Sequence, residues 1–70
     1  MIPLTYAEIG EEKIIKKVGG SNEVRTHLKD LGFVPGSGVT LINVINGNTI
    51  VKVKESRIAI NEELARKIMV

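Results

Sequence analysis

Three side chains in one stretch of the chain have the types and spacing of metal ligands. Glu23, His27 and Asp30 follow one another at intervals of four and three residues, so a helix would place them on one face. Imidazole and carboxylate groups both bind divalent transition metals. The same spacing is also typical of a solvated carboxylate–histidine pair that only supports a helix. Glu23 and His27 are therefore weak candidates for metal ligands, and we predict neither a firm metal site nor a cofactor.

The residue combinations that catalysis needs are not visible. The chain has one histidine and no cysteine, and its acids are scattered, so neither a nucleophile–base pair nor paired carboxylates can be assembled. Gly32, Gly36 and Gly38 could suggest a phosphate-binding loop, but that loop needs a Gly-Lys-Ser/Thr sequence that opens a helix. We expect these glycines to serve backbone geometry, and we predict that the protein is not an enzyme.

A basic surface is a further possibility. Lys13, Lys16, Lys17, Lys52 and Lys54 could share a face if neighbouring strands carry them. Such a face would attract an acidic partner or lipid headgroups. Lysines on strands more often keep a sheet surface solvated or protect its edge, and the sequence leaves both interpretations open.

Residues 31–42 are the first candidate region for binding a partner. They contain more large apolar side chains than a turn requires, so most are expected in the core while one or two stay exposed for docking. Together with two of the lysines, the predicted partner-binding residues are Leu31, Phe33, Val34, Ile42, Lys52 and Lys54.

A helix over residues 23–31 is expected to carry the candidate metal ligands. Ser21 or Asn22 can cap its beginning, and Gly32 can end it in a left-handed conformation. Its apolar stripe at intervals of four and three residues comprises Val24, Leu28 and Leu31.

Two strands are expected on either side of this helix. Residues 12–18 are rich in β-branched side chains and predict one strand, in which a bulge could occur. After the helix, Pro35 and Gly36 predict a type II turn. The turn leads into residues 39–45, which we expect to be apolar on both faces and to form the most buried strand.

The second half of the chain predicts a meander. Asn-Gly within residues 46–48 is typical of a type I′ hairpin turn. Residues 49–54 then alternate between valines expected inward and lysines expected outward. A turn at Glu55 and Ser56 leads into a strand over residues 57–60, whose two isoleucines share a face.

Short elements are expected at both ends. Thr5 and Glu8 have the spacing of a capping box, which predicts one helical turn ending at Gly10. Near the C-terminus, Asn61 can cap a short helix whose first turn carries two glutamates. Residues 68–70 predict a last strand.

These elements predict a mainly β protein. About five short strands with tight turns, and one helix of about three turns, favour a small, partly open antiparallel barrel. Residues 1–70 contain no repeat or linker and are expected to form a single domain.

The amino-acid composition limits the classes of partner that this chain can bind. Ten basic and eight acidic residues give a net charge of +2, and Tyr6 and Phe33 are the only aromatic residues, so nucleic-acid binding is not expected. The lack of cysteine fits a reducing, cytoplasmic setting. No apolar run approaches the length that crosses a bilayer, and the beginning of the chain lacks the pattern of a signal peptide, so neither membrane insertion nor export is expected.

The sequence resembles the FeoA family, small SH3-like barrel proteins of bacterial ferrous iron transport. The resemblance lies in "LTYAEIG", "LKDLGFVPGSGVTLI", "TIVKVKESRIAI" and the closing "ARKIMV", in this order over nearly the whole chain. The barrel is also similar to the C-terminal domain of iron-dependent repressors. Many relatives have a longer loop where this chain has "NVINGNT".

The resemblance implies a cytoplasmic accessory protein, monomeric or weakly self-associating. Its partner would be FeoB, the membrane ferrous-iron transporter that carries a GTP-binding domain, and it would act on the cytoplasmic part of FeoB by protein–protein contact. The resemblance brings no catalytic motif. One alternative stays open, a domain that itself binds or senses a transition metal ion. A small nucleic-acid-binding barrel is disfavoured by the nearly balanced charge and the two aromatic residues.

Overall fold

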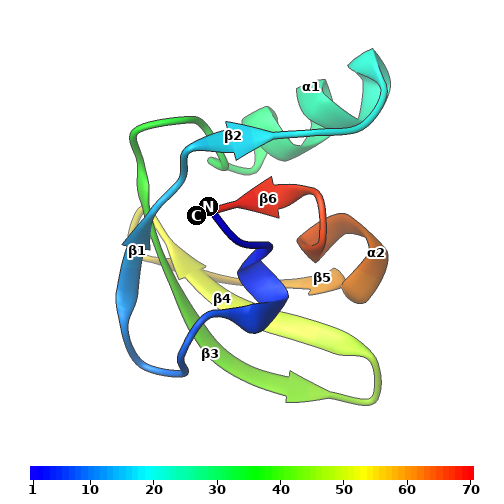
Figure 1. Ribbon diagram of the computed structural model, residues 1–70. Coiled ribbons are helices and arrows are strands. Elements are labelled where there is room, and N and C mark those ends of the chain that lie inside the picture. The colour runs from blue at the N-terminus through cyan, green and yellow to red at the C-terminus, as the bar shows by residue number, and fades with distance from the viewer.

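The computed structural model describes residues 1–70 and contains six strands and three short helical segments (Figure 1). The strands are β1 (Glu12–Ile14), β2 (Lys17–Val18), β3 (Gly38–Ile45), β4 (Asn48–Val53), β5 (Ser56–Asn61) and β6 (Ile68–Met69). The helical segments are the 3-10 helix η1 (Leu4–Tyr6) and the α-helices α1 (Asn22–Asp30) and α2 (Glu62–Ala65). One antiparallel sheet has the order β1-β3-β4-β5, and a second sheet pairs β2 with β6. The mainly β prediction is confirmed, with one strand more than expected.

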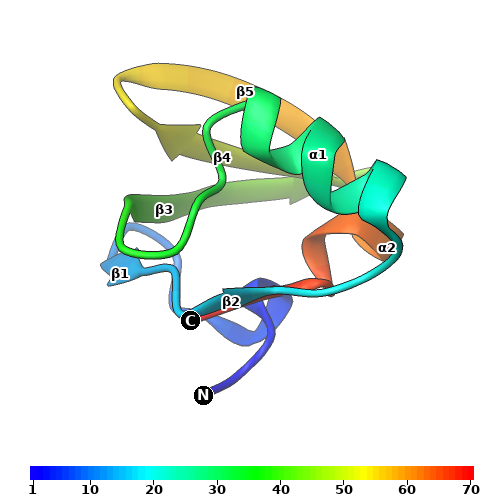
Figure 2. The ribbon, with the colours of Figure 1, turned by 90° about the horizontal axis from the view of Figure 1, so that it is seen from above.

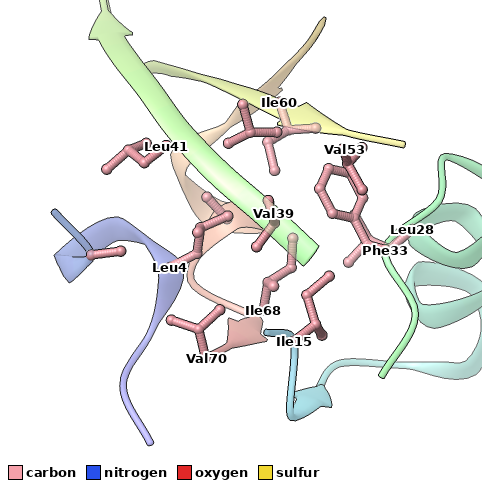
Figure 3. Close-up of a cluster of buried hydrophobic side chains, with 13 residues drawn as sticks. Leu4, Ile15, Leu28, Phe33, Val39, Leu41, Val53, Ile60, Ile68 and Val70 are labelled. Atoms are coloured by element: carbon pink, nitrogen blue, oxygen red, sulfur yellow. The ribbon is translucent and has the colours of Figure 1, made fainter. Parts of the chain in front are cut away.

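Side chains from both sheets and all three helical segments meet in one core (Figure 3). Leu4 of η1, Leu28 of α1 and Ile68 of β6 are fully buried within a cluster of 13 apolar residues. The chain ends lie side by side, because Ile2 and Val70 exchange two backbone hydrogen bonds of 2.9 and 2.8 Å. The core therefore joins the beginning, the middle and the end of the chain.

The predicted alternation along β4 is confirmed. Val51 and Val53 are buried, whereas Lys52 between them is exposed. This is the period of two that places successive side chains on opposite faces of a strand. The two isoleucines of the neighbouring β5 also share the inner face, so one face of this sheet covers the core and the other meets solvent.

The predictions for the two α-helices are confirmed, that for α1 to within one residue at each end. The Ser21 hydroxyl accepts a hydrogen bond from the Val24 N–H at 3.3 Å and caps α1, and Gly32 follows the helix with φ of +107°. The Asn61 side chain accepts a hydrogen bond from the Leu64 N–H at 2.8 Å and caps α2. Neither helix has the length or the apolar content to cross a bilayer.

Two predicted turns are also confirmed. Gly36 has φ of +93°, and the Ser37 N–H donates to the Val34 carbonyl at 3.0 Å, which is the geometry of a type II turn. Between β3 and β4, Asn46 and Gly47 both have positive φ, as a type I′ turn requires.

The turn between β4 and β5 lies one residue earlier than predicted. Val53 pairs with Ser56, so Lys54 and Glu55 form the turn. Both adopt positive φ, 48° and 66°. Neither is glycine or asparagine, the residues that normally mark such a turn in a sequence, and the prediction of a turn at Glu55 and Ser56 was therefore wrong.

Residues 12–18 form two strands instead of the single predicted one. The Ile15 N–H donates to the Ser37 carbonyl at 2.9 Å, and the Lys16 N–H donates to the Met69 carbonyl at 2.8 Å. The chain thus passes from one sheet to the other at this point, since β1 pairs with β3 and β2 pairs with β6. The interruption is a change of sheet, not a bulge within one strand.

The end of β3 is exposed, contrary to the prediction that residues 39–45 form the most buried strand. Val44 and Ile45 are 51% and 47% exposed. The register shifts between Leu41 and Asn43, and beyond this shift β3 pairs only with β4, because β1 covers only its first three residues. With no strand on its other side, this end of β3 protrudes from the core.

The first helical segment begins earlier than predicted and has no side-chain cap. η1 starts at Leu4 and ends at Tyr6, so Thr5 lies inside the segment and does not form a capping box with Glu8. Pro3 stands at the N-cap position with an extended backbone, φ −61° and ψ 146°, and makes no side-chain cap hydrogen bond. The capping-box prediction was wrong because Thr5 lies within the segment and Pro3, which has no side-chain hydroxyl, is at the N-cap position.

Thr49 is a fully buried residue whose hydroxyl has no hydrogen-bond partner. Burying an unpaired hydroxyl costs free energy. We expect Thr49→Val to raise the free energy of unfolding by about 1 kcal/mol, measured by urea denaturation. Thr49→Ser is the control, because it keeps the hydroxyl and removes a buried methyl group, and it should destabilise. A less stable Thr49→Val protein would show that the hydroxyl has a partner.

Candidate protein-binding surface

The outer face of the four-stranded sheet carries a row of polar side chains that crosses all four strands. Glu12 of β1 pairs with Thr40 of β3, and Lys52 of β4 follows in the same row. Lys52 in turn pairs with Arg57 of β5. Because side chains alternate between faces, this row lies opposite the buried valines of β3 and β4.

A hollow of about 370 Å³ lies over the part of this row that β1, β3 and β4 contribute. Gly38 makes room in it, because a Cβ added there would lie 2.6 Å from Oε2 of Glu12. No lining residue is hydrophobic, so the hollow suits a polar or charged group better than an apolar side chain. Its lining residues are Glu12, Ser37, Gly38, Thr40, Lys52, Lys54 and Glu55.

Three cations beside the hollow form what we call the basic cluster, Lys52, Lys54 and Arg57. All three are exposed, and the two ion pairs of the structure join other residues. Lys52 and Arg57 stand directly opposite each other on adjacent strands, an arrangement that destabilises a sheet when both charges have the same sign. A carboxylate or phosphate from a partner would offset this repulsion.

The structure places two of the predicted partner-binding residues, Lys52 and Lys54, at the hollow. Lys52 lies on the outer sheet face and Lys54 in the adjoining turn. A Cβ added at Gly32 would lie 3.4 Å from Cδ of Lys54, so the stem of this lysine reaches the segment that follows α1. Ile42 is half-buried at the irregular point of β3.

Phe33 does not belong to the exposed surface. It is 1% exposed and lies in the core beside Val53 and Leu28 (Figure 3). Leu31 and Val34 are half-buried, and Leu31 packs against the core. The candidate surface therefore narrows to Leu31, Val34, Ile42, Lys52 and Lys54, and the structure adds Arg57, which the sequence analysis did not name.

The weak metal candidates lie away from this surface. Glu23 and His27 are exposed on α1 and line a shallow hollow of about 420 Å³ with Asp30. No three side chains of histidine, cysteine, aspartate or glutamate come together in a way that could hold a metal ion. Helical spacing remains the one feature that suggests a metal there.

Comparison with known proteins identifies the family. Residues 2–70 match the FeoA domain family. The chain belongs to the FeoA family. It is 41% identical over 70 residues to the "Putative Fe(2+) transport protein A" of Methanocaldococcus jannaschii, an alignment that covers 100% of this chain and 85% of that protein. The match agrees with the resemblance seen in the sequence.

Solved structures of FeoA proteins share the fold of this FeoA-family chain. A crystal structure of an iron uptake regulatory protein (FeoA) aligns with a TM-score of 0.89 and 29% identity, covering 99% of this chain and 92% of that one. The zinc-complexed FeoA of Stenotrophomonas maltophilia, described as an SH3 domain protein, aligns with a TM-score of 0.85 and 20% identity, covering 100% and 89%. The fold is therefore SH3-like, as the resemblance implied.

An exposed apolar group near η1 was missed in the sequence analysis. Tyr6, Ile9 and Val44 are 76%, 65% and 51% exposed. Ile9 forms an isolated parallel bridge with Leu41, which places the segment after η1 beside β3. Val44 is exposed because the end of β3 protrudes from the core. The pattern of apolar residues in the sequence does not show which strands pair with β3 there, so it could not predict this exposure.

A small cavity of about 190 Å³ lies beside these residues. Tyr6 and Val44 line it together with Glu62 and Arg66. Arg66 donates a hydrogen bond of 2.8 Å to Oε1 of Glu62, and this bond raises the pKa of Arg66 above its ordinary value. This exposed pair links the first residue of α2 to the residue that follows its last turn and stabilises the helix locally.

Proposed function

We propose that this FeoA-family chain is a cytoplasmic accessory protein of ferrous iron uptake that binds the cytoplasmic part of the transporter FeoB. Membership of the FeoA family and 41% sequence identity to a putative Fe(2+) transport protein support a role in ferrous iron uptake. In this proposal residues 1–70 act as one domain, monomeric or weakly self-associating, which works through its exterior.

The observation that carries the proposal is the basic cluster beside the polar hollow. Lys52, Lys54 and Arg57 have no ion-pair partner within the chain, and two of them repel each other across the sheet. An acidic surface of a partner would complement these charges. The half-buried apolar residues Val34 and Ile42 would add contact area at the margin.

The proposed mechanism is a shift between conformations of the transporter. A bound accessory protein changes the populations of two states only as far as it binds one more tightly than the other. A tenfold preference corresponds to about 1.4 kcal/mol, which a few charge-assisted contacts can supply. No catalytic step by this chain is part of the proposal.

Reversing two charges of the basic cluster tests the proposal. We expect Lys52→Glu/Lys54→Glu to weaken binding to full-length FeoB in lipid nanodiscs by about tenfold or more, measured by biolayer interferometry. The wild-type interaction should also weaken as ionic strength rises.

The matched control is Lys16→Glu/Lys17→Glu, which makes the same change in net charge at exposed positions outside the four-stranded sheet. It should bind FeoB as the wild type does. Equal weakening by both double variants would mean that net charge, and not the basic cluster, governs binding. Absence of wild-type binding at high micromolar concentration would refute the proposed function.

A further inference from the structure

The outer edge of β5 is an unpaired strand edge. β5 is the last strand in the order β1-β3-β4-β5, and it lies on the opposite side of the sheet from β1 (Figure 2). It has six residues, the same length as β4. Such an edge presents backbone donors and acceptors that can pair with another chain.

The register shows which backbone groups are free. The two-residue turn makes Val53 and Ser56 a hydrogen-bonded pair, and such pairs alternate along an antiparallel ladder. Ile58 and Ile60 therefore bond to β4, whereas the N–H and C=O groups of Arg57 and Ala59 point away from it. No backbone hydrogen bond outside the ladders and no side-chain hydrogen bond reaches these two residues.

The free edge is also accessible. Arg57 and Ala59 are both exposed residues, and Ile58 between them is only partly buried. α1 meets the core through Leu28, and it forms no backbone hydrogen bond with β5. An added strand would thus find both hydrogen-bonding groups and a partly uncovered isoleucine.

Positive charge accompanies this edge. Arg57 lies on it, and Lys52 lies directly opposite Arg57 on β4. A strand added beside β5 would lie about 10 Å from β4, which is two strand spacings. Carboxylates on its outer face would therefore meet Arg57 directly and approach Lys52, relieving the repulsion between two like charges.

We propose that β5 accepts an extended acidic segment of a protein partner as an additional strand, with backbone bonds at Arg57 and Ala59 and carboxylates facing the basic cluster. A nucleic acid or a lipid headgroup could satisfy the charges but not the alternating N–H and C=O groups. A second copy of this chain could satisfy the backbone, but it would bring a second basic cluster toward the first. The inference rests on the proposed function in that the partner is a protein.

The test uses a short acetylated and amidated peptide in which glutamate alternates with valine. It is added to the isotope-labelled protein and followed by NMR. We expect saturable shifts of the Arg57 and Ala59 amides and slower hydrogen exchange at both. The same peptide with lysine in place of glutamate should bind at least tenfold more weakly, as should one with N-methyl groups on its bonding edge.

Protein variants complete the test. Arg57→Glu should weaken binding of the acidic peptide by roughly tenfold. Lys16→Glu makes the same charge reversal outside this sheet and should leave the affinity for the peptide unchanged. Because the peptide controls leave the protein intact, a misfolded variant would not decide the result.

Four results would overturn the inference. They are no saturable shift at millimolar peptide, shifts confined to the hollow at Ser37 and Thr40, equal binding of the N-methylated peptide, or a concentration-dependent dimer that protects β5. A parallel measurement with FeoB nanodiscs separates the two proposals. If FeoB binds and the peptide does not, strand addition is wrong and the proposed function stands. If the peptide binds and FeoB does not, strand addition stands and the proposed function is wrong.

Discussion

Replacing Phe33 by alanine should lower the free energy of unfolding by about 3–5 kcal/mol. The ring is 1% exposed and packs beside Val53 and Leu28 in the core (Figure 3). Removing it takes away a large apolar contact area and leaves a cavity that its neighbours fill only partly. A domain of 70 residues has little stability in reserve, so we expect much of the Phe33→Ala protein to be unfolded at 37 °C.

Urea denaturation followed by circular dichroism measures this loss. Tyr6→Ala is the matched control, because Tyr6 is the one other aromatic residue and is 76% exposed. Its free energy of unfolding should change by no more than about 0.5 kcal/mol. A loss below about 1 kcal/mol for Phe33→Ala would mean that Phe33 is not part of the core and would return it to the docking candidates.

Substituting Gly36 by valine should lower the free energy of unfolding by about 2 kcal/mol. Gly36 has φ of +93°, a conformation that β-branched residues rarely adopt. No atom lies within 4 Å of a Cβ added there, so the cost comes from the backbone and not from a steric clash. The turn it forms sets the direction from α1 into β3.

The comparison that isolates the backbone effect is Gly36→Asn. Asparagine tolerates positive φ far better than valine does, and the site has space for either side chain. We expect Gly36→Asn to lose less than half as much stability as Gly36→Val in the same urea experiment. Equal losses for both variants, or full stability of Gly36→Val, would contradict the type II turn.

The local elements of this protein could be predicted from the sequence because the interactions that form them span a few residues. Ser21 caps α1 by accepting a hydrogen bond from the residue three positions later. Gly32 and Gly36 both occupy positions of positive φ. Asn46 and Gly47 form the two-residue turn of a hairpin. Alternation along β4 followed in the same way from neighbouring side chains. The barrel itself was predictable because these signals, in their order, leave few other arrangements for so short a chain.

Contacts between distant segments decided what the sequence did not show. Residues 12–18 have strand propensity throughout, and only the partners β3 and β6 determine that the chain changes sheet at Ile15. The exposure of Val44 depends likewise on where β1 stops pairing with β3. The turn at Lys54 and Glu55 is set by the pairing of the strands on either side and has no local signature.

The candidate site shows the same division. The lysines at positions 52 and 54 were visible at once, and the outward direction of Lys52 followed from alternation along β4, whereas Lys54 lies in the following turn. Whether they form a binding surface depends on how the strands pair. The register places Arg57 opposite Lys52, and the strand order leaves one edge of β5 unpaired. Register is a relation between two segments. Shifting the pairing by one residue would turn every side chain of the strand to the other face of the sheet. For this reason the sequence alone supplied the candidate residues, and only the tertiary structure decided that Phe33 is buried and that Arg57 lies beside Lys52.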